Sequence, residues 1–381
     1  MSQKTVHISP RQFMILIALF VVGSAVLFIP TILAGVAKQD AWISCIIGIL
    51  CGVLLAWFYG SFSKVKPEMS YIELAEFAFG KWGGIGIALL TFTFHIMLAS
   101  ILLWDIGDFL VTQILVGTPI EVIYYMFIYV SIVYATSLGI EPIARSAEIF
   151  FPWVIILFGV IAVFTLPEVD KNNILPVFEQ GPMPILYGAY YMIGFPFVEM
   201  VLLLMITPYI SDQKKVVPSF IFGVLLGSVI LFVLTLLSIL VLGSDFSSRN
   251  EFPIYVLGKK ISIGEFLERI EVVVAIIWFI SIFFKLSLVG HSFIIGMSQI
   301  LKMKDYRPLT FPFAIFLIAL TILSYPSSVY IKEFSKYAST PYMIFVGFII
   351  PAFVLIIAII KKNKLNNKEK LDGAPSKNIG S

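Results

Sequence analysis

Two charged residues lie deep inside apolar stretches that are long enough to cross a lipid bilayer. Glu199 belongs to the run from Pro184 to Ile210, and Lys285 belongs to the run over residues 268–299. A charge at bilayer depth costs ~2.5–3.5 kcal/mol on insertion scales, so such residues are usually paired or functional. At the helical rise, about 15 and about 17 residues place them ~22 and ~25 Å into their spans. We predict that both face the protein interior and pair, directly or through water, in a structural or a gating role.

The stretch that carries Glu199 is interrupted just before it. Gly194, Phe195 and Pro196 stand in the segment YYMIGFPFVE. Glycine loosens a helix, and proline removes a backbone donor and clashes with the preceding turn. Inside a membrane the freed backbone groups must be satisfied by protein or by a cavity. Carbonyl groups at this break could accept hydrogen bonds from an ammonium group, and Phe195 or Phe197 could close over a ligand. The alternative is a packing kink.

A second interruption lies in the first apolar segment, Phe13–Val36, which carries Gly23, Ser24 and Ala25 at mid-depth. Small residues allow an unwound turn whose free N–H groups could hold a carboxylate. They also serve close helix packing, which is the alternative. Breaks in corresponding spans of two halves are typical of an inverted-repeat transporter fold. The two breaks together therefore predict a binding site between them.

Three further polar residues lie in the third apolar segment. His95 is near mid-membrane, where we expect a helix-contact role rather than a proton relay. Asp105 and Asp108 come later and, by the helical rise, close to the outer interface. We expect both carboxylates to be solvated at a vestibule.

The composition excludes a soluble domain. Of 381 residues, 59% are hydrophobic and 13% are charged, which predicts a polytopic, all-α membrane protein. A metal-ligand cluster, a phosphate-binding loop and a nucleophile triad are missing from the sequence, so we expect no enzyme, no cofactor and no nucleic-acid partner. Apolar segments predict ten spans, at residues 12–36, 41–61, 84–114, 120–138, 147–166, 184–208, 216–242, 268–299, 309–326 and 340–360. A short interfacial helix is expected over residues 71–79.

The distribution of basic residues orients these spans. With the N-terminus inside, 17 of the 26 Lys and Arg residues fall on the inner side, which predicts cytoplasmic termini. The chain then divides into a cytoplasmic start (1–11), a first five-helix repeat (12–166), an outer connection (167–183), a second repeat (184–360) and a basic tail (361–381). We expect the tail to be disordered, with its lysines on anionic lipid.

Several segments, in this order, resemble one known family. They are HISPRQ, GSAVLFIP, DAWIS, GKWGG, GIEPIARSAEIFFP, NNILPVFEQGPMPILYGA and ERIEVVVAIIW. Together they are similar to the B subunit of bacterial spore germinant receptors, a branch of the amino acid–polyamine–organocation superfamily. The resemblance runs from about residue 8 to residue 360. It implies a LeuT-like fold of ten helices in a 5+5 inverted repeat, with helices 1 and 6 interrupted.

The resemblance also implies a function and partners. Family members recognise a small nutrient, typically an amino acid, in the inner membrane of the spore. They work with an A subunit, a C-subunit lipoprotein and often a small D subunit. Sodium-coupled relatives of the fold hold a cation between spans 1 and 8, where Lys285 and Ser287 stand here. An ammonium in place of that cation would argue against sodium dependence.

Two functions remain open at this stage. In the first, the chain is a receptor subunit that binds the nutrient between spans 1, 3, 6 and 8 and thereby shifts toward a signalling state. In the second, it is an amino acid permease of the same fold, proton-coupled or uncoupled, in which the same pocket alternates between the two sides. Sugars and nucleosides remain open as ligands.

Overall fold

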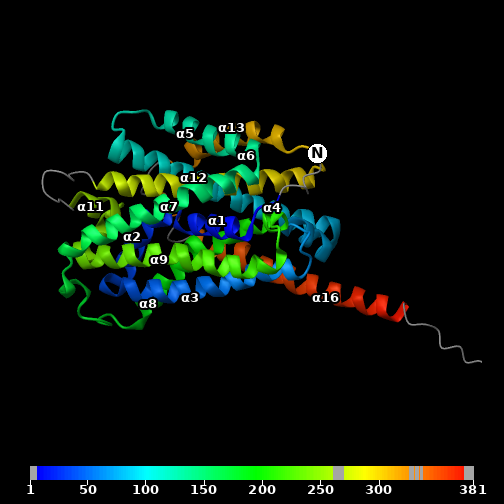
Figure 1. Ribbon diagram of the computed structural model, residues 1–381, viewed down its shortest axis with the longest axis horizontal. Coiled ribbons are helices and arrows are strands. Elements are labelled where there is room, and N and C mark those ends of the chain that lie inside the picture. The colour runs from blue at the N-terminus through cyan, green and yellow to red at the C-terminus, as the bar shows by residue number, and fades with distance from the viewer. Residues whose placement is uncertain (1–6, 261–269, 326–329, 331–333, 335–337, 373–381) are drawn as a thin grey trace, which may run out of the picture.

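The protein is a bundle of long helices that run side by side (Figure 1). The computed structural model describes residues 7–260, 270–325, 330, 334 and 338–372. Within these ranges the α-helices are α1 Pro10–Val22, α2 Ala25–Ala37, α3 Ala41–Gly60, α4 Tyr71–Phe109, α5 Ile120–Ile128, α6 Thr136–Leu138, α7 Ile140–Thr165, α8 Pro182–Met192, α9 Val216–Leu242, α10 Ser244–Arg249, α11 Pro253–Lys260, α12 Glu271–Ile300, α13 Thr310–Ser324, α15 Thr340–Ile344 and α16 Ile350–Asp372.

Helical segments occupy all ten predicted spans. In the described ranges, nine helical stretches are long and apolar enough to cross a membrane, and the shorter apolar helix α1 is a tenth. One stretch, Ala25–Lys64, has 40 residues. At 1.5 Å per residue it would measure ~60 Å, about twice the hydrocarbon thickness. The chain turns inside it at Lys38, where φ is 50° and α2 ends. Hence α1 and α2 together form the first crossing, and α3 forms the second.

The short helix predicted over residues 71–79 is confirmed as the first part of α4. Ser70 and Glu73 form a capping box: the Ser70 side chain accepts from the Glu73 N–H, and the Glu73 carboxylate accepts from the Ser70 N–H at 2.8 Å. Gly80, with φ 79° and ψ 176°, then turns the chain before the membrane-crossing part begins. Glycine tolerates this backbone conformation, which a residue with a Cβ rarely adopts.

The first span lies at the centre of the bundle. Every residue of α1 from Ile15 to Val22 is buried. Helix α9 packs closely against it, because Gly223 and Gly227 put no side chain between the two backbones. A Cβ on Gly227 would lie 2.8 Å from the carbonyl oxygen of Ala18. This small-xxx-small spacing is a typical way for membrane helices to approach each other.

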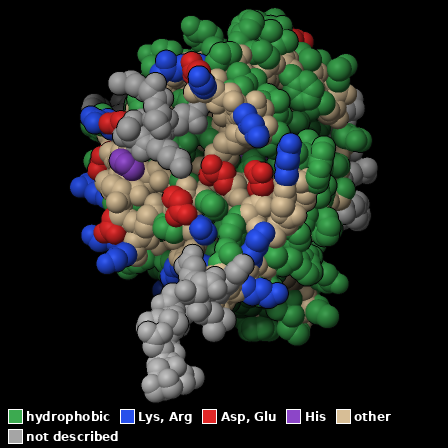
Figure 2. Space-filling model, turned by 90° about the vertical axis from the view of Figure 1, so that its right-hand side faces the viewer, with side chains coloured by type: hydrophobic (Ala, Val, Ile, Leu, Met, Phe, Trp, Pro, Cys, Tyr) green, Lys and Arg blue, Asp and Glu red, His purple; other side chains and the backbone are tan. Residues whose placement is uncertain are grey.

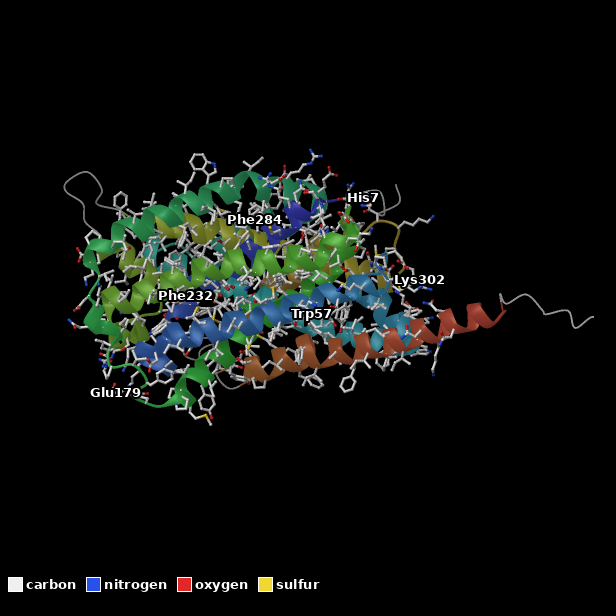
Figure 3. All side chains as sticks on the ribbon, turned by 60° about the horizontal axis from the view of Figure 1, so that its bottom comes forward. His7, Trp57, Glu179, Phe232, Phe284 and Lys302 are labelled. Atoms are coloured by element: carbon white, nitrogen blue, oxygen red, sulfur yellow. The ribbon has the colours of Figure 1, made fainter. Side chains whose placement is uncertain are left out.

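Labelled polar residues mark the two ends of the bundle. His7 and Lys302 lie at one end, and Glu179 lies at the other (Figure 3). Lys and Arg side chains gather over the end that carries the described start of the chain (Figure 2). The sequence predicts that this end is cytoplasmic, and we refer to it below as the inner end.

Helix α16 differs from the predicted tail. It continues from Ile350 to Asp372, past residue 360, where disorder was expected; residues 373–381 lie outside the described ranges. One cause is an anchor at the membrane boundary. The Lys362 ammonium donates to the carbonyl oxygens of Lys64 at 3.0 Å and Val65 at 2.6 Å. A helix fixed at that point can extend beyond the bundle, as α16 does in Figure 1.

Candidate functional site

The first span breaks at a single residue. Helix α1 ends at Gly23, whose φ of 26° and ψ of −126° are not helical, and α2 starts at Ala25. Lys285 of α12 fills the space beside the break: a Cβ on Gly23 would lie 2.4 Å from its Cδ. Glycine is needed here for two reasons, because the backbone angle is unfavourable for other residues and because the lysine side chain leaves no room.

The sixth span breaks over a longer segment. Helix α8 ends at Met192, a π-helical turn covers Ile193–Phe197, and a 3₁₀ stretch covers Val198–Met205. Phe195, with φ −131° and ψ 113°, is extended, and Pro196 follows it through a cis peptide bond. Regular α-helical hydrogen bonding is therefore lost along this whole segment, although no residue in it has a positive φ.

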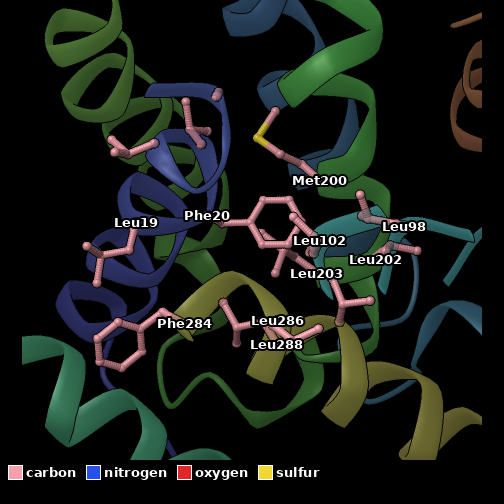
Figure 4. Packing of buried hydrophobic residues seen from close by; sticks show 14 of the residues in the cluster. Leu19, Phe20, Leu98, Leu102, Met200, Leu202, Leu203, Phe284, Leu286 and Leu288 are labelled. Carbon is pink, nitrogen blue, oxygen red and sulfur yellow. The ribbon is translucent and has the colours of Figure 1, made fainter. Parts of the chain in front are cut away.

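A buried ion pair joins the two breaks. The Nζ atom of Lys285 lies 2.5 Å from Oε2 of Glu199, and both side chains are fully buried. The same ammonium lies 5.2 Å from the ring centroid of Phe20 in α1 and 4.8 Å from that of Phe195. Figure 4 shows Phe20 reaching from α1 toward Leu102. The lysine thus contacts the first break with its methylene stem and the sixth span with its charge.

The predicted pairing of Glu199 with Lys285 is confirmed as a direct contact. Such a pair in a low-dielectric interior adds little net stability, but loss of one partner leaves an uncompensated charge and costs about 3–5 kcal/mol. Oε1 of Glu199 has no hydrogen-bond partner among the described residues. The pair therefore leaves one carboxylate oxygen available to a further donor.

A cavity of about 410 Å³ leads from the outer end of the bundle down to Glu199. Its mouth is formed by the segment that connects α10 and α11, which lie away from the N-terminus in Figure 1. Four parts of the chain make the walls: the first span, α4, the broken sixth span and the start of the tenth. The lining residues are Ser24, Phe28, Thr31, Ile32, Gly35, Val36, Leu98, Ile101, Leu102, Trp104, Asp105, Tyr191, Phe195, Glu199, Ser248, Arg249, Asn250, Glu251, Ser339, Thr340 and Met343.

Three of the predicted site residues line this cavity: Ser24, Phe195 and Glu199. Gly23, Ala25, Gly194 and Pro196 form the breaks themselves without lining it. Lys285 does not line the cavity itself but contacts two residues that do, Glu199 and Phe195.

The other predicted residues pack elsewhere. The ring of Phe197 lies against Gly52 of α3, where a Cβ would approach it within 2.8 Å, so Phe195 and not Phe197 faces the cavity. His95 is buried between α4 and α12; its Nδ1 lies 2.7 Å from the Thr91 carbonyl, and its ring contacts Phe293. Ser287 is fully buried, and its hydroxyl has no hydrogen-bond partner in the described part of the chain.

Two features of the site differ from the sequence-based expectation. Asp105, expected at a solvated vestibule, is only 6% exposed and lines the cavity. The tenth span, through Ser339, Thr340 and Met343, takes the place in the wall that was expected for span 8. The segment after α10 contributes to the first difference, because Phe252, and Tyr255 of α11, pack against Phe109, which lies one turn beyond Asp105 on α4.

The inner end of the site is closed. The Ile8 N–H donates to the Tyr209 carbonyl at 2.8 Å, so the start of the chain is joined to the segment that follows the sixth span. Gln12 donates to Glu148 of α7 at 3.0 Å. Burial, and secondarily the nearby charge of Glu73, raises the pKa of Tyr209 to about 12, so its phenol stays neutral at physiological pH. None of these inner residues lines the cavity, whose lining reaches the outer end at Arg249 and Glu251.

Comparison with known proteins assigns the family. The family model described as spore germination protein matches residues 7–329. The chain belongs to the spore germination protein family. It is 29% identical over 379 residues to spore germination protein KB of Bacillus subtilis (strain 168), a match that covers 97% of this chain and 99% of that protein. The resemblance noted in the sequence is thereby confirmed.

Solved structures establish the fold. The chain is similar to Mhp1, a nucleobase-cation-symport-1 family transporter in a closed conformation with bromovinylhydantoin bound, with a TM-score of 0.63, 12% identity and coverage of 96% of this chain and 94% of that one. It is also similar to a Na⁺-coupled sialic acid symporter in a substrate-bound outward-open state, with a TM-score of 0.64, 13% identity and coverage of 98% and 92%. This chain therefore has the LeuT-like fold, with helices 1 and 6 interrupted.

Proposed function

We propose that this chain is the membrane-embedded subunit of a spore germinant receptor and that it binds a small nutrient, an amino acid, in the cavity between the two breaks. One observation carries the proposal: an outward-open cavity of about 410 Å³ ends at two interrupted helices and a buried carboxylate. Cavities that bind small solutes are concave, mostly apolar and carry a few placed polar groups. The described walls have this character.

The two breaks offer complementary chemistry to such a nutrient. The N–H groups at the start of α2, beside Ser24, suit a carboxylate because a helix N-terminus favours negative charge. The carbonyl groups freed in the sixth span, near Phe195, suit an ammonium group. We propose that the nutrient lies across both breaks and favours one arrangement of spans 1 and 6 over another. Its differential affinity for the two arrangements then shifts the population, which is the signal.

The receptor role includes partners and a location. We propose that the subunit acts with the A and C subunits, and in some receptors with a small D subunit, in the inner membrane of the spore. Both termini face the cytoplasm in this proposal, because 17 of the 26 Lys and Arg residues then fall on the inner side. Chemical transformation of the nutrient is not part of the function, so the protein is not an enzyme.

Filling the cavity tests the proposal directly. Gly35 lines the cavity, and a Cβ added there meets no atom within 4 Å, so Gly35→Trp places a bulky ring in the space with little strain on the helix. Gly86 of α4 is matched in that it also has open space around a Cβ but does not line the cavity. Spores that carry Gly35→Trp should require at least tenfold more nutrient to germinate than spores that carry Gly86→Trp.

The readout is germination across a panel of amino acids, sugars and nucleosides, compared with spores that lack the gene. Immunoblots of spore membranes must show equal amounts of the two variants. An unchanged response of Gly35→Trp to every nutrient that requires this gene would contradict the proposed location of the site.

A permease is the second candidate, because the similar solved structures are transporters. The same cavity would then alternate between outer and inner access, with the contacts of Ile8 and Gln12 as the inner closure. Uptake of radiolabelled amino acids into proteoliposomes separates the two functions. Accumulation by the purified subunit alone would favour the permease, and binding without accumulation would favour the receptor.

A further inference from the structure

Asp105 is a buried carboxyl group without an assigned role. It lies in the membrane part of α4, is 6% exposed and lines the same cavity as Glu199. It interacts electrostatically with Glu199, Glu251 and Lys285. None of the ion pairs found among the described residues includes it. A buried carboxylate without a close cation is costly, so Asp105 must be neutralised, either by a proton or by a positively charged ligand.

The positive charges nearby are already engaged. The Lys285 ammonium pairs with Glu199 at 2.5 Å and lies among the rings of Phe20 and Phe195. Arg249, at the mouth, pairs with Asp245 at 2.8 Å, and both of these side chains are 77% exposed. The two buried carboxyl groups of the lining, Asp105 and Glu199, therefore have one buried ammonium between them, that of Lys285, and it pairs with Glu199. The cavity is negative in its buried part.

Two unpartnered acceptors in the same cavity point to a missing donor. Oε1 of Glu199 is fully buried and has no hydrogen-bond partner among residues that the structure describes. The hydroxyl of Ser24, 1% exposed, is in the same situation. Both residues line the cavity beside Asp105. An ammonium group has three N–H donors and one positive charge, and so satisfies both the acceptors and the unbalanced charge.

We propose that the ligand of this cavity carries a protonated amine and that Asp105 is its counter-ion, with Oε1 of Glu199 as a second acceptor. This inference rests on the proposed nutrient site and adds to it the position of the amine, between Asp105 of α4 and Glu199 of the sixth span. The hydrocarbon part of the ligand lies against Phe28, Leu98 and Leu102. The face of Phe195 adds a favourable surface for the cation.

The same geometry disfavours the other nutrient classes. A monocarboxylate without an amine brings a second negative charge toward Asp105 and Glu199, and it repels both. A sugar offers hydroxyl donors but no charge, and it would bury its polar groups against the apolar walls of α2 and α4. The negative charge and apolar side chains of the cavity lining, and not the cavity volume, thus select for an amine.

Matched sets of small molecules test the charge requirement. One set is L-valine, isobutylamine, which lacks the carboxylate, 3-methylbutanoate, which lacks the amine, and isobutanol, which lacks both charges. Equivalent sets are built on alanine and leucine. Binding is measured as ligand-induced thermal stabilisation of the purified, detergent-solubilised chain. We expect stabilisation by members that carry an amine and none by their amine-free counterparts.

Variants of Asp105 test the residue assignment. Asp105→Asn keeps the shape and removes the charge, and it should weaken amine binding about tenfold to a hundredfold, the usual value of a charge-assisted contact. Asp105→Glu keeps the charge and should retain more affinity than the Asn variant. Asp108→Asn, on the same helix but outside the cavity lining, removes a carboxylate that interacts with Asp105 without facing the ligand, and it should weaken amine binding less than Asp105→Asn does. The melting temperature without ligand reports whether each variant is folded.

The possible results distinguish a failure of the amine and Asp105 assignment from a failure of the proposed nutrient site. Stabilisation by 3-methylbutanoate or isobutanol but not by the amines would overturn the ligand class and leave a nutrient site in place. Amine binding that Asp105→Asn does not change would overturn the role of Asp105. Stabilisation by no member of any set, together with normal germination by Gly35→Trp spores, would remove the proposed site and the inference with it.

Discussion

The two interrupted spans of this protein break in different ways. The first break is a point: a single glycine with φ 26° separates two regular helices, and the Lys285 side chain packs directly beside it. The sixth is an extended segment: a π-helical turn and a 3₁₀ stretch together cover Ile193–Met205. A point break has one geometry, whereas an extended break can distribute a change over many residues. We infer that spans 1 and 6 act as a fixed hinge and a deformable segment.

The ion pair is the element that both breaks share, so its removal should have the largest effect. Lys285→Ala leaves the Glu199 carboxylate buried without a partner and should lower the free energy of unfolding by about 3–5 kcal/mol. It should also abolish the nutrient response. The measurements are thermal unfolding of the purified protein and spore germination at wild-type nutrient concentrations.

A double variant and a surface pair serve as controls. Lys285→Met together with Glu199→Gln removes both charges at similar volume, and should recover much of the stability but not the response. The exposed pair of Arg145 and Glu141 has the same 2.5 Å separation, and Arg145→Ala should cost no more than about 1 kcal/mol. A normal nutrient response by Lys285→Ala would show that the lysine takes no part in the mechanism.

The point break should tolerate substitution poorly. In Gly23→Ala, the new Cβ would lie 2.4 Å from Lys285 Cδ and 2.9 Å from the Phe20 carbonyl oxygen, at a φ that alanine rarely adopts. We expect a loss of about 1–3 kcal/mol in the free energy of unfolding. Gly227→Ala is not a suitable control, because its Cβ would also meet a backbone oxygen; Gly86→Ala, with open space, is suitable and should have no loss.

The extended break should tolerate the same substitution better. In Gly194→Ala the nearest atom is a side-chain methyl, Cγ2 of Thr340, at 2.7 Å, and the φ of Gly194 is not positive. A methyl group on the neighbouring helix can shift, so the expected loss is about 1 kcal/mol. Thr340→Ser removes that methyl and should restore stability when combined with Gly194→Ala. Equal losses at Gly23 and Gly194 in thermal unfolding would contradict the distinction between the breaks.

The helix breaks and the buried charge pair of this site can be predicted from the sequence. Which side chains face the cavity, and which are shielded by distant segments, cannot. Gly23 and Pro196 predict helix breaks because the wide φ range of glycine and the missing N–H of proline are properties of the residues themselves. Glu199 and Lys285 could be paired from depth alone, since both spans run in the same direction. The choice between Phe195 and Phe197 depends on the helical phase, which the π-helical turn changes.

Asp105 was placed wrongly for a related reason. The count of residues along α4 gives its depth, but not the contacts that Phe252 and Tyr255 make with Phe109, one turn further along the helix. The tenth span lines the cavity through Ser339 and Thr340, at the start of its helix. The sequence did not predict this, because that helix carries no pattern typical of binding. Contacts between distant segments decide both positions, and neither composition nor periodicity reports such contacts.

The smallest effect is expected at Ser287, whose substitution tests whether a free cation binds near the break at Gly23. Its hydroxyl is fully buried without a hydrogen-bond partner in the described ranges, so Ser287→Ala removes an unsatisfied polar group. Replacement of such a group is nearly neutral or slightly stabilising, within about 1 kcal/mol. If Lys285 alone supplies the positive charge between spans 1 and 8, the variant should also keep its nutrient response in media with sodium and in media with potassium instead. A response that fails in Ser287→Ala, or that requires sodium in the unaltered protein, would mean that a free cation binds beside the hinge and that the ammonium does not replace it.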